Sequence, residues 1–206
     1  MTEEEACSWI SERYGEDRLG KLESFVKILL AENGQQNLIS KASEAQIWVR
    51  HILDSAQLDR LAEGADTWLD VGSGPGLPGI VLACLSERPI LMVEPRRRRV
   101  EFLERAIEAL ELPHARVRQA EVQRMTGDRF EAVTARAYAP LPQIFKSTVQ
   151  LTTPSTIWVL PKGRTAEREL DEARQSWQGV FHVERSLTDA DARIIVARDV
   201  RQKVKT

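Results

Sequence analysis

The sequence predicts an α/β fold in which a mostly parallel, seven-stranded sheet follows an N-terminal helical extension. Two observations support this prediction. Apolar residues before Leu61 recur at three- and four-residue intervals, which is typical of amphipathic helices. After Leu61, short apolar or β-branched runs alternate with helical stretches, as in parallel sheets covered by helices on both faces. We therefore expect a helical extension over residues 1–64, packed on one compact core over residues 65–206.

The extension is expected to contain three helices. The apolar residues of the first two are Trp9, Ile10, Tyr14, Leu22, Phe25, Val26, Leu29 and Leu30. Asn33 and Gly34 should end the second helix, because both residue types favour the left-handed conformation that closes helices. Ser43 and Gln46 resemble a capping box, which predicts the start of the third helix.

The core is expected to contribute all the strands. The seven runs are TWLDV (67–71), ILMVE (90–94), ARVRQ (115–119), EAVTARA (131–137), TIWVL (156–160), GVFHVE (179–184) and RIIVARDV (193–200). Helices are expected over residues 77–85, 97–110 and 141–149. The turn around Thr188 to Ala192 is too short for a crossover helix, so the last two strands should pair antiparallel.

Composition limits the classes of function. With 31 acidic and 29 basic residues the net charge is −2, so any nucleic-acid site must be a local feature of the surface. Cys7 and Cys84 are too few for a disulfide framework or a zinc cluster, and we expect no metal site. The acidic start MTEEEACSWI lacks an export signal, and the apolar run IVLACL is too short to cross a membrane. These features predict a cytoplasmic protein without a membrane partner.

A glycine-rich loop follows the first predicted strand. Gly72, Gly74 and Gly76 stand between that strand and the next helix, where open α/β sheets bind ligands beyond the carboxyl ends of their strands. Leu77 breaks the dinucleotide pattern G-x-G-x-x-G, which favours S-adenosylmethionine over a nicotinamide dinucleotide. The alternative is a glycine turn that serves only the packing of the helix on the strand.

An acidic residue ends the second predicted strand. A carboxylate at Glu94 can accept hydrogen bonds from both ribose hydroxyls of a nucleoside. The alternative is an acidic strand end that serves only solubility. The combination of the glycine loop with Glu94 favours nucleoside binding.

Several segments resemble a known family in both content and order. They are NLIS (37–40), RHILDS (50–55), DVGSGPGLPGI (70–80), VEPRRRRVEFL (93–103), QAE (119–121), ARAYAPL (135–141) and LPKG (160–163). This set resembles the bacterial 16S ribosomal RNA guanine-N7 methyltransferases, also called glucose-inhibited division protein B or small-subunit methyltransferase G. The resemblance extends from residue 37 to residue 163.

The resemblance implies a class I, Rossmann-like methyltransferase with S-adenosylmethionine as methyl donor and S-adenosylhomocysteine as product. The implied substrate is N7 of one guanosine in the decoding-region loop of 16S rRNA, within a small-subunit particle, and no protein partner is implied. The implied donor contacts are Gly72, Gly74, Gly76 and Leu77, with Glu94 on the ribose, Ala120 and Glu121 at the adenine, and Arg136 near the transferred methyl group. Arg136 is thereby also the candidate catalytic residue.

Four residues are candidates for RNA contact: Arg96, Arg97, Tyr138 and Lys162. Each has a structural alternative, and for the two arginines it is a solvated helix start. Arg97 can pair with Glu101 on the same helix face, Tyr138 can be a core residue, and Lys162 can be a solvated strand end. Pro95 and the arginine run 96–99 depart from the family pattern, so the local RNA contacts are open.

Two further residues have a structural interpretation. Arg136 can pair with an acidic neighbour such as Glu131 instead of acting at the site. His51 lies in a predicted helix beside Asp54, and we interpret it as a packing or capping residue between the extension and the sheet.

Two alternative functions use the same features. One is a class I methyltransferase that acts on a small molecule or a protein. The other is a non-catalytic nucleoside-binding module. Guanine N7 carries a lone pair and no proton, so its methylation requires positioning and no general base.

Overall fold

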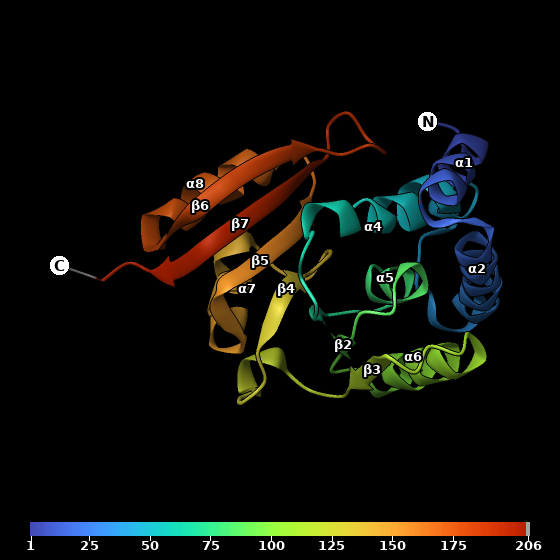
Figure 1. Ribbon diagram of the computed structural model, residues 1–206, viewed down its shortest axis with the longest axis horizontal. Coiled ribbons are helices and arrows are strands. Elements are labelled where there is room, and N and C mark those ends of the chain that lie inside the picture. Colours follow the sequence, from blue (N-terminus) through green and yellow to red (C-terminus); the bar gives the residue numbers. More distant parts are fainter. Residues whose placement is uncertain (205–206) are drawn as a thin grey trace.

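The computed structural model describes residues 1–204, and its centre is a seven-stranded sheet with the order β3-β2-β1-β4-β5-β7-β6 (Figure 1). The strands are β1 (Trp68–Val71), β2 (Ile90–Val93), β3 (Ala115–Arg118), β4 (Phe130–Thr134), β5 (Thr152–Lys162), β6 (Trp177–Arg185) and β7 (Arg193–Gln202). The first five strands pair in parallel, and β7 is antiparallel to both β5 and β6. The predicted sheet and the antiparallel pairing of its last two strands are confirmed.

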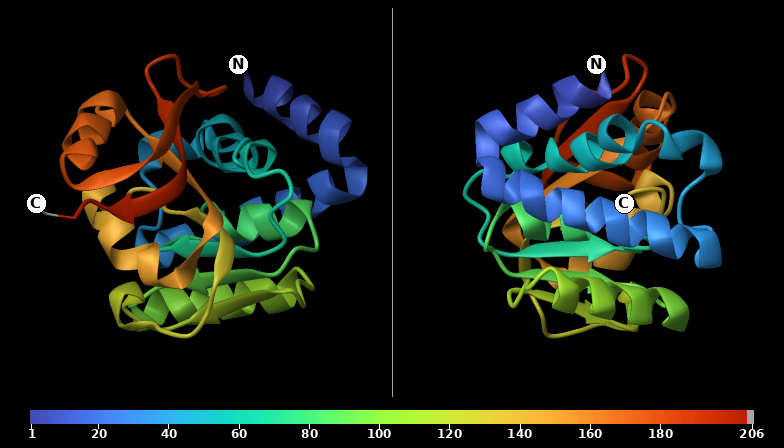
Figure 2. Two further views of the ribbon diagram at one scale, coloured as in Figure 1. Left: turned by 60° about the vertical axis from the view of Figure 1, so that its left-hand side comes forward. Right: turned by 90° about the vertical axis from the view of Figure 1, so that its right-hand side faces the viewer.

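The helices cover the two faces of the sheet. The main helices are α1 (Glu3–Tyr14), α2 (Glu16–Gln36), α5 (Gly79–Leu85), α6 (Arg97–Ala109), α7 (Leu141–Thr148) and α8 (Ala166–Ser176). The helices α1, α2, α5 and α6 pack on one face, and α7 and α8 pack on the opposite face (Figures 1 and 2). This arrangement is the doubly wound architecture expected for alternating strands and helices.

Two apolar clusters lie on opposite faces of the sheet. One contains Leu22, Phe25 and Leu29 of α2 together with core residues of α5, β1 and β2. The other is centred on aromatic rings, with Phe145 of α7 meeting Trp158 of β5 edge-on at a centroid distance of 5.7 Å. The helical extension therefore shares its hydrophobic core with one face of the sheet.

Two predicted features of the extension were wrong. Helix α2 continues past Asn33 and Gly34 and ends at Gln36, where Asn37 adopts the left-handed conformation and donates its N–H to the Asn33 carbonyl. The buried Asn33 side chain instead accepts the Ile39 N–H at 2.8 Å. The residue that closes the helix is thus the next asparagine along the chain.

The capping box at Ser43 and Gln46 is also absent. Ser43 lies inside α3 (Lys41–Glu44), and a π-helical turn η1 (Trp48–Leu53) leads into α4 (Asp54–Ala56). The first N–H groups of η1 are bonded by a residue that is distant in sequence: the Glu3 carboxylate accepts from the Trp48 N–H and from the Val49 N–H, each at 2.9 Å. A side chain of α1 therefore replaces the predicted local cap.

The helix after β1 begins at Gly79 rather than at Leu77, because residues 72–78 form the turn that precedes it. Helices α6 and α7 begin at Arg97 and Leu141, as predicted. Within the described part of the chain, no helix is both long enough and apolar enough to span a membrane.

Candidate functional site

The register of the sheet brings the candidate residues to one edge. Val71 lies opposite Val93, and Asp70 lies opposite Thr134. The glycine loop after β1, Glu94 after β2 and Arg136 after β4 consequently leave the sheet at the same carboxyl edge. This is the edge at which open α/β sheets bind their ligands.

The glycine loop is closely surrounded by side chains. Gly72 and Gly76 have φ of +71° and +83°. A β-carbon on Gly72 would lie 2.5 Å from Cδ2 of Tyr138, and one on Gly76 would lie 2.6 Å from Cγ1 of Ile80. Both positions therefore require glycine for conformation and for space.

Glu94 is oriented by the loop itself. Its carboxylate is buried, with Oε2 accepting the Gly74 N–H and Oε1 accepting the Arg96 N–H, both at 3.0 Å. Nη1 of Arg99 lies 3.9 Å from Oε2. Each carboxylate oxygen has two lone pairs, so each can accept one further hydrogen bond from a ligand.

Sequence reasoning missed Asp70, which lies beneath the loop. Its side chain is fully buried, Oδ2 accepts the Gly79 N–H at 3.1 Å, and Oδ1 has no hydrogen-bond partner among the described residues. Burial raises the pKa of Asp70 to about 7, against the lowering effects of Ser73, Gly79 and Arg136. A single charged residue within the apolar strand WLDV was the signal that could have identified it.

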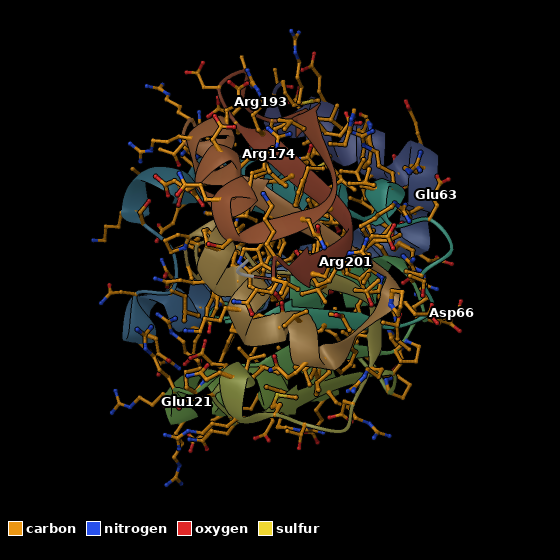
Figure 3. The ribbon with its side chains drawn as sticks, turned by 90° about the vertical axis from the view of Figure 1, so that its left-hand side faces the viewer. Glu63, Asp66, Glu121, Arg174, Arg193 and Arg201 are labelled. Atoms are coloured by element: carbon orange, nitrogen blue, oxygen red, sulfur yellow. The ribbon has the colours of Figure 1, made fainter. Side chains whose placement is uncertain are left out.

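The third predicted contact segment follows β3. Ala120 is half-buried, and Glu121 is exposed and pairs with Arg124 at 2.8 Å. The side-chain amide of Gln119 donates to the Pro95 carbonyl at 3.3 Å, which joins this segment to the loop after β2. Figure 3 shows Glu121 and Arg193 at opposite ends of the molecule, so the adenine end proposed at Glu121 lies far from the β6–β7 turn.

Arg136 is half-buried and contacts the helical extension. Nη1 lies 3.3 Å from both Oδ2 of Asp54 and the Arg50 carbonyl oxygen, and Nη2 lies 3.2 Å from Nδ1 of His51. Arg136 is thus paired with an acidic neighbour, as the structural alternative expects, but the partner is Asp54. Glu131, the partner suggested from the sequence, instead accepts the Asp66 N–H at 2.7 Å. The structure places His51 between the extension and the sheet, as interpreted from the sequence.

Lys162 supports the loop that carries Tyr138. Its side chain is only 9% exposed, and Nζ lies 2.8 Å from both the Ala139 carbonyl oxygen and Oε2 of Glu169. The same Glu169 oxygen accepts the Leu141 N–H at 3.0 Å. This pair lowers the pKa of Glu169, although burial acts in the opposite direction.

Arg96 and Arg97 are exposed at the start of α6. Arg97 makes the expected pair with Glu101, at 2.7 Å. Such an exposed pair is worth little and leaves Arg97 able to change partner.

A cavity of about 890 Å³ lies beside the glycine loop. Arg136, Tyr138 and Lys162 line it, together with the start of α1, the 43–54 segment and the β6–β7 turn. Gly72 and Glu94 are not part of its lining. Because Tyr138 also touches Gly72, its ring stands between the glycine loop and the cavity.

Comparison with known proteins identifies the family. A family model described as rRNA small subunit methyltransferase G matches residues 18–195. The chain belongs to this family. It is similar to the ribosomal RNA small subunit methyltransferase G of Novosphingobium aromaticivorans, with 44% identity over 96% of this chain and 89% of the relative. It is 45% identical to the protein of that name from Sphingopyxis alaskensis, over 94% of this chain and 85% of the relative.

Solved structures confirm the predicted class I fold. An O-methyltransferase from Bacillus cereus in complex with SAH is similar with a TM-score of 0.58 and 14% identity, over 85% of this chain and 90% of that chain. A methyltransferase from Geobacter sulfurreducens is similar with a TM-score of 0.58 and 11% identity, over 85% of this chain and 88% of that chain. As a methyltransferase G family member, the chain is an S-adenosylmethionine-dependent methyltransferase.

The edge described above fits this donor. A β-carbon on Gly74 would meet no atom closer than Nη1 of Arg99 at 3.4 Å, so a ligand can approach the loop backbone there. Glu94 has one acceptor position left on each oxygen, which suits the two hydroxyls of a ribose. All the individual donor contacts stay predictions: Gly72, Gly74, Gly76, Leu77, Glu94, Ala120, Glu121 and Arg136.

Proposed function

We propose that this chain transfers the methyl group of S-adenosylmethionine to N7 of one guanosine in 16S rRNA. The observation that carries the proposal is the position of Tyr138, which touches the glycine loop on one side and lines the cavity on the other. A methyl donor bound along the loop and a base bound in the cavity would meet at this residue.

The donor side is formed by the glycine loop and Glu94. Gly72, Gly74, Gly76 and Leu77 offer backbone to the donor, and the oriented Glu94 carboxylate accepts from its ribose. Ala120 and Glu121 extend the site toward the adenine. The bound donor supplies an activated methyl group, so the protein has to hold the two substrates in line.

The acceptor side is formed by the cavity. N7 of guanine lies in the deep major groove of A-form RNA, so the target base must be unstacked before it can enter. Tyr138 is 37% exposed and offers a ring face for stacking. Arg136 lines the same cavity, where Asp54 and His51 hold its guanidinium, and it is proposed to act on the reacting groups.

The described residues that line the cavity include no free histidine base, and the proposed reaction needs none. His51 is the histidine in the cavity lining, and its Nδ1 already accepts from Arg136. Burial, with the charges of Arg136 and Arg50, lowers the pKa of His51 to about 4. Attack by the N7 lone pair releases no proton from the nucleophile, so positioning alone can account for catalysis.

The RNA is proposed to bind as part of a small-subunit particle in the cytoplasm. Arg96 and Arg97 are exposed beside the glycine loop, where they can contact phosphates. Lys162 is proposed to act on the RNA through the loop that it supports, because its own charge is paired with Glu169. The proposal includes no membrane and no protein partner.

The test is to map N7-methylguanine on 16S rRNA. Small-subunit particles from cells that lack this protein are incubated with S-adenosylmethionine, with and without the purified chain. We expect one new N7-methylguanine that appears only with the protein, and Gly74→Val should abolish it. Particles that stay unmethylated under saturating donor would refute the assignment.

The same assay distinguishes the two alternatives. A small-molecule or protein methyltransferase should consume the donor without ribosomal material. A nucleoside-binding module should bind S-adenosylmethionine in a calorimeter and never consume it. Consumption of the donor that depends on the small-subunit RNA excludes both.

A further inference from the structure

Arg136 is held by one short segment of the helical extension. Nη1 donates to the Arg50 carbonyl oxygen and to Oδ2 of Asp54, each at 3.3 Å, and Nη2 donates to Nδ1 of His51 at 3.2 Å. A guanidinium has five N–H groups, and these contacts use three of them. The Nε–H and one Nη2 hydrogen have no partner among the described residues and stay available beside the cavity.

The contact with Arg136 fixes the protonation of His51. A guanidinium can only donate, so Nδ1 must be the unprotonated nitrogen of the ring. The proton then lies on Nε2, which donates to Oγ of Ser43 at 2.9 Å. The Ser43 hydroxyl in turn donates a hydrogen bond to the Ser40 carbonyl oxygen at 2.8 Å. His51 therefore acts here as a neutral acceptor whose orientation is fixed from the other side.

Asp54 is held equally firmly. Oδ2 faces Arg136, and Oδ1 accepts from Thr188 Oγ1 at 3.0 Å and from Nε2 of Gln57 at 3.1 Å. The amide oxygen of Gln57 also accepts the Leu187 N–H at 2.8 Å. The carboxylate is thus fixed between the extension and the β6–β7 turn, and it directs its second oxygen at Arg136.

We propose that Asp54 and His51 are positioning residues for methyl transfer: they orient Arg136 so that its two remaining N–H groups face the cavity. The inference rests on the proposed function, because it concerns the same site. It assigns a role in the reaction to the RHILDS segment of the extension, which lies more than eighty residues before Arg136. His51 lies in the π-helical turn η1, and such turns are frequent at functional sites.

The kinetic test compares variants of this network with a matched control. Asp54→Ala and His51→Leu should lower kcat on small-subunit particles by ten-fold or more, with a change of KM below three-fold. His51→Asn should recover part of that loss, because its amide oxygen can take the place of Nδ1 as an acceptor. Glu32→Gln is the control. Glu32 is 13% exposed and pairs with Arg105 of α6, so this substitution removes an ion pair between the extension and the core that lies away from Arg136. The kcat of Glu32→Gln should stay within two-fold of the parent value.

A double-mutant cycle shows whether the effect passes through Arg136. When Asp54→Ala is added to Arg136→Lys, kcat should fall by less than a further three-fold, because the guanidinium that Asp54 orients is already absent. Full, multiplicative losses in the double variant would overturn the proposal, and so would an Asp54→Ala protein as active as the parent. If Asp54→Ala does not fold, Asp54→Asn replaces it in the same cycle.

A spectroscopic readout needs neither donor nor RNA. The chain has three histidines, so the imidazole nitrogen spectrum can be assigned by single substitutions. At neutral pH we expect His51 with its proton on Nε2, and a change of the Nδ1 signal in Arg136→Lys. A His51 ring protonated on Nδ1 would overturn the proposal. If the parent methylates no 16S rRNA, the proposed function fails, while this spectrum still decides whether His51 holds Arg136.

Discussion

The ring of Tyr138 lies against the α-carbon of Gly72, in the space that any side chain at position 72 would occupy. The contact joins the loop after β1 to the loop after β4. A change on either side of the contact is therefore expected to alter both the donor site and the wall of the cavity.

Gly72→Ala is expected to weaken S-adenosylmethionine binding by at least ten-fold, or about 1.4 kcal/mol, because its β-carbon displaces Tyr138. Calorimetric titration measures the affinity. Gly64→Ala is the matched control, since Gly64 also has a positive φ, of +82°, but a β-carbon there meets nothing within 4 Å. Adding Tyr138→Ala to Gly72→Ala should recover part of the affinity. Equal effects of the Gly64 and Gly72 substitutions would show that backbone strain alone is responsible.

Glu94→Ala should reduce donor affinity about ten- to a hundred-fold, because a charged acceptor contributes about 1.5–3 kcal/mol to a hydrogen bond. The loss also frees the N–H groups of Gly74 and Arg96 that the carboxylate holds. The same calorimetry applies, with Glu101→Ala as a control for an acidic residue of α6 that faces solvent and pairs with Arg97. An unchanged affinity in a folded Glu94→Ala protein would contradict the ribose assignment.

Lys162→Met should lower the free energy of unfolding by about 1–3 kcal/mol, because it leaves Glu169 and the Ala139 carbonyl without their partner. Denaturant titration measures this change. Arg164→Met is the control, since its pair with Asp191 is exposed and should contribute about 0–1 kcal/mol. Unchanged stability combined with weaker RNA binding would instead favour a direct contact between Lys162 and RNA.

Asp70→Asn should change how stability depends on pH. The pKa of Asp70 is raised by burial to about 7, so the native state binds the proton more tightly than the unfolded state does. The stabilisation that comes from this tighter proton binding is fully present at low pH. It is lost as the pH rises from the usual pKa of an aspartate through the raised pKa of about 7. The parent should therefore lose free energy of unfolding relative to Asp70→Asn between about pH 4 and about pH 7. Asp66→Asn provides the exposed control, and parallel pH profiles of Asp70→Asn and the parent would contradict the prediction.

Local patterns in the sequence predicted most of the sheet. The apolar runs around Trp68, Ile90 and Ile157 form strands because side chains buried on both faces read as continuous apolar stretches. The glycine loop and Glu94 could be placed for the same reason, since each directly follows such a strand. Asp70 had a comparable signal, as a charge inside an apolar strand, and could have been found.

The remaining features depend on contacts between distant residues. Glu3 caps the π-helical turn from α1, and Asp54 meets Arg136 across the extension and the core. No spacing rule connects such positions, because their distance along the chain is set by the whole fold. The end of α2 was also difficult to predict, although the residues involved are close in sequence. Helix α2 continues through Gly34 and ends at Gln36, after which the Asn37 N–H and the Ile39 N–H both bond to Asn33.

The shared core of the extension and the sheet has a consequence for any shortened form of the protein. Ile10, Leu22, Phe25 and Leu29 are completely buried, and α2, which carries the last three, packs against α5. A chain that began at residue 65 would expose this surface to water, lose the partners of Arg136, and favour self-association over independent folding. Residues 1–64 and the strands that follow should therefore unfold in a single cooperative transition, and a newly synthesised extension has to wait for the sheet before it can bury its apolar side chains.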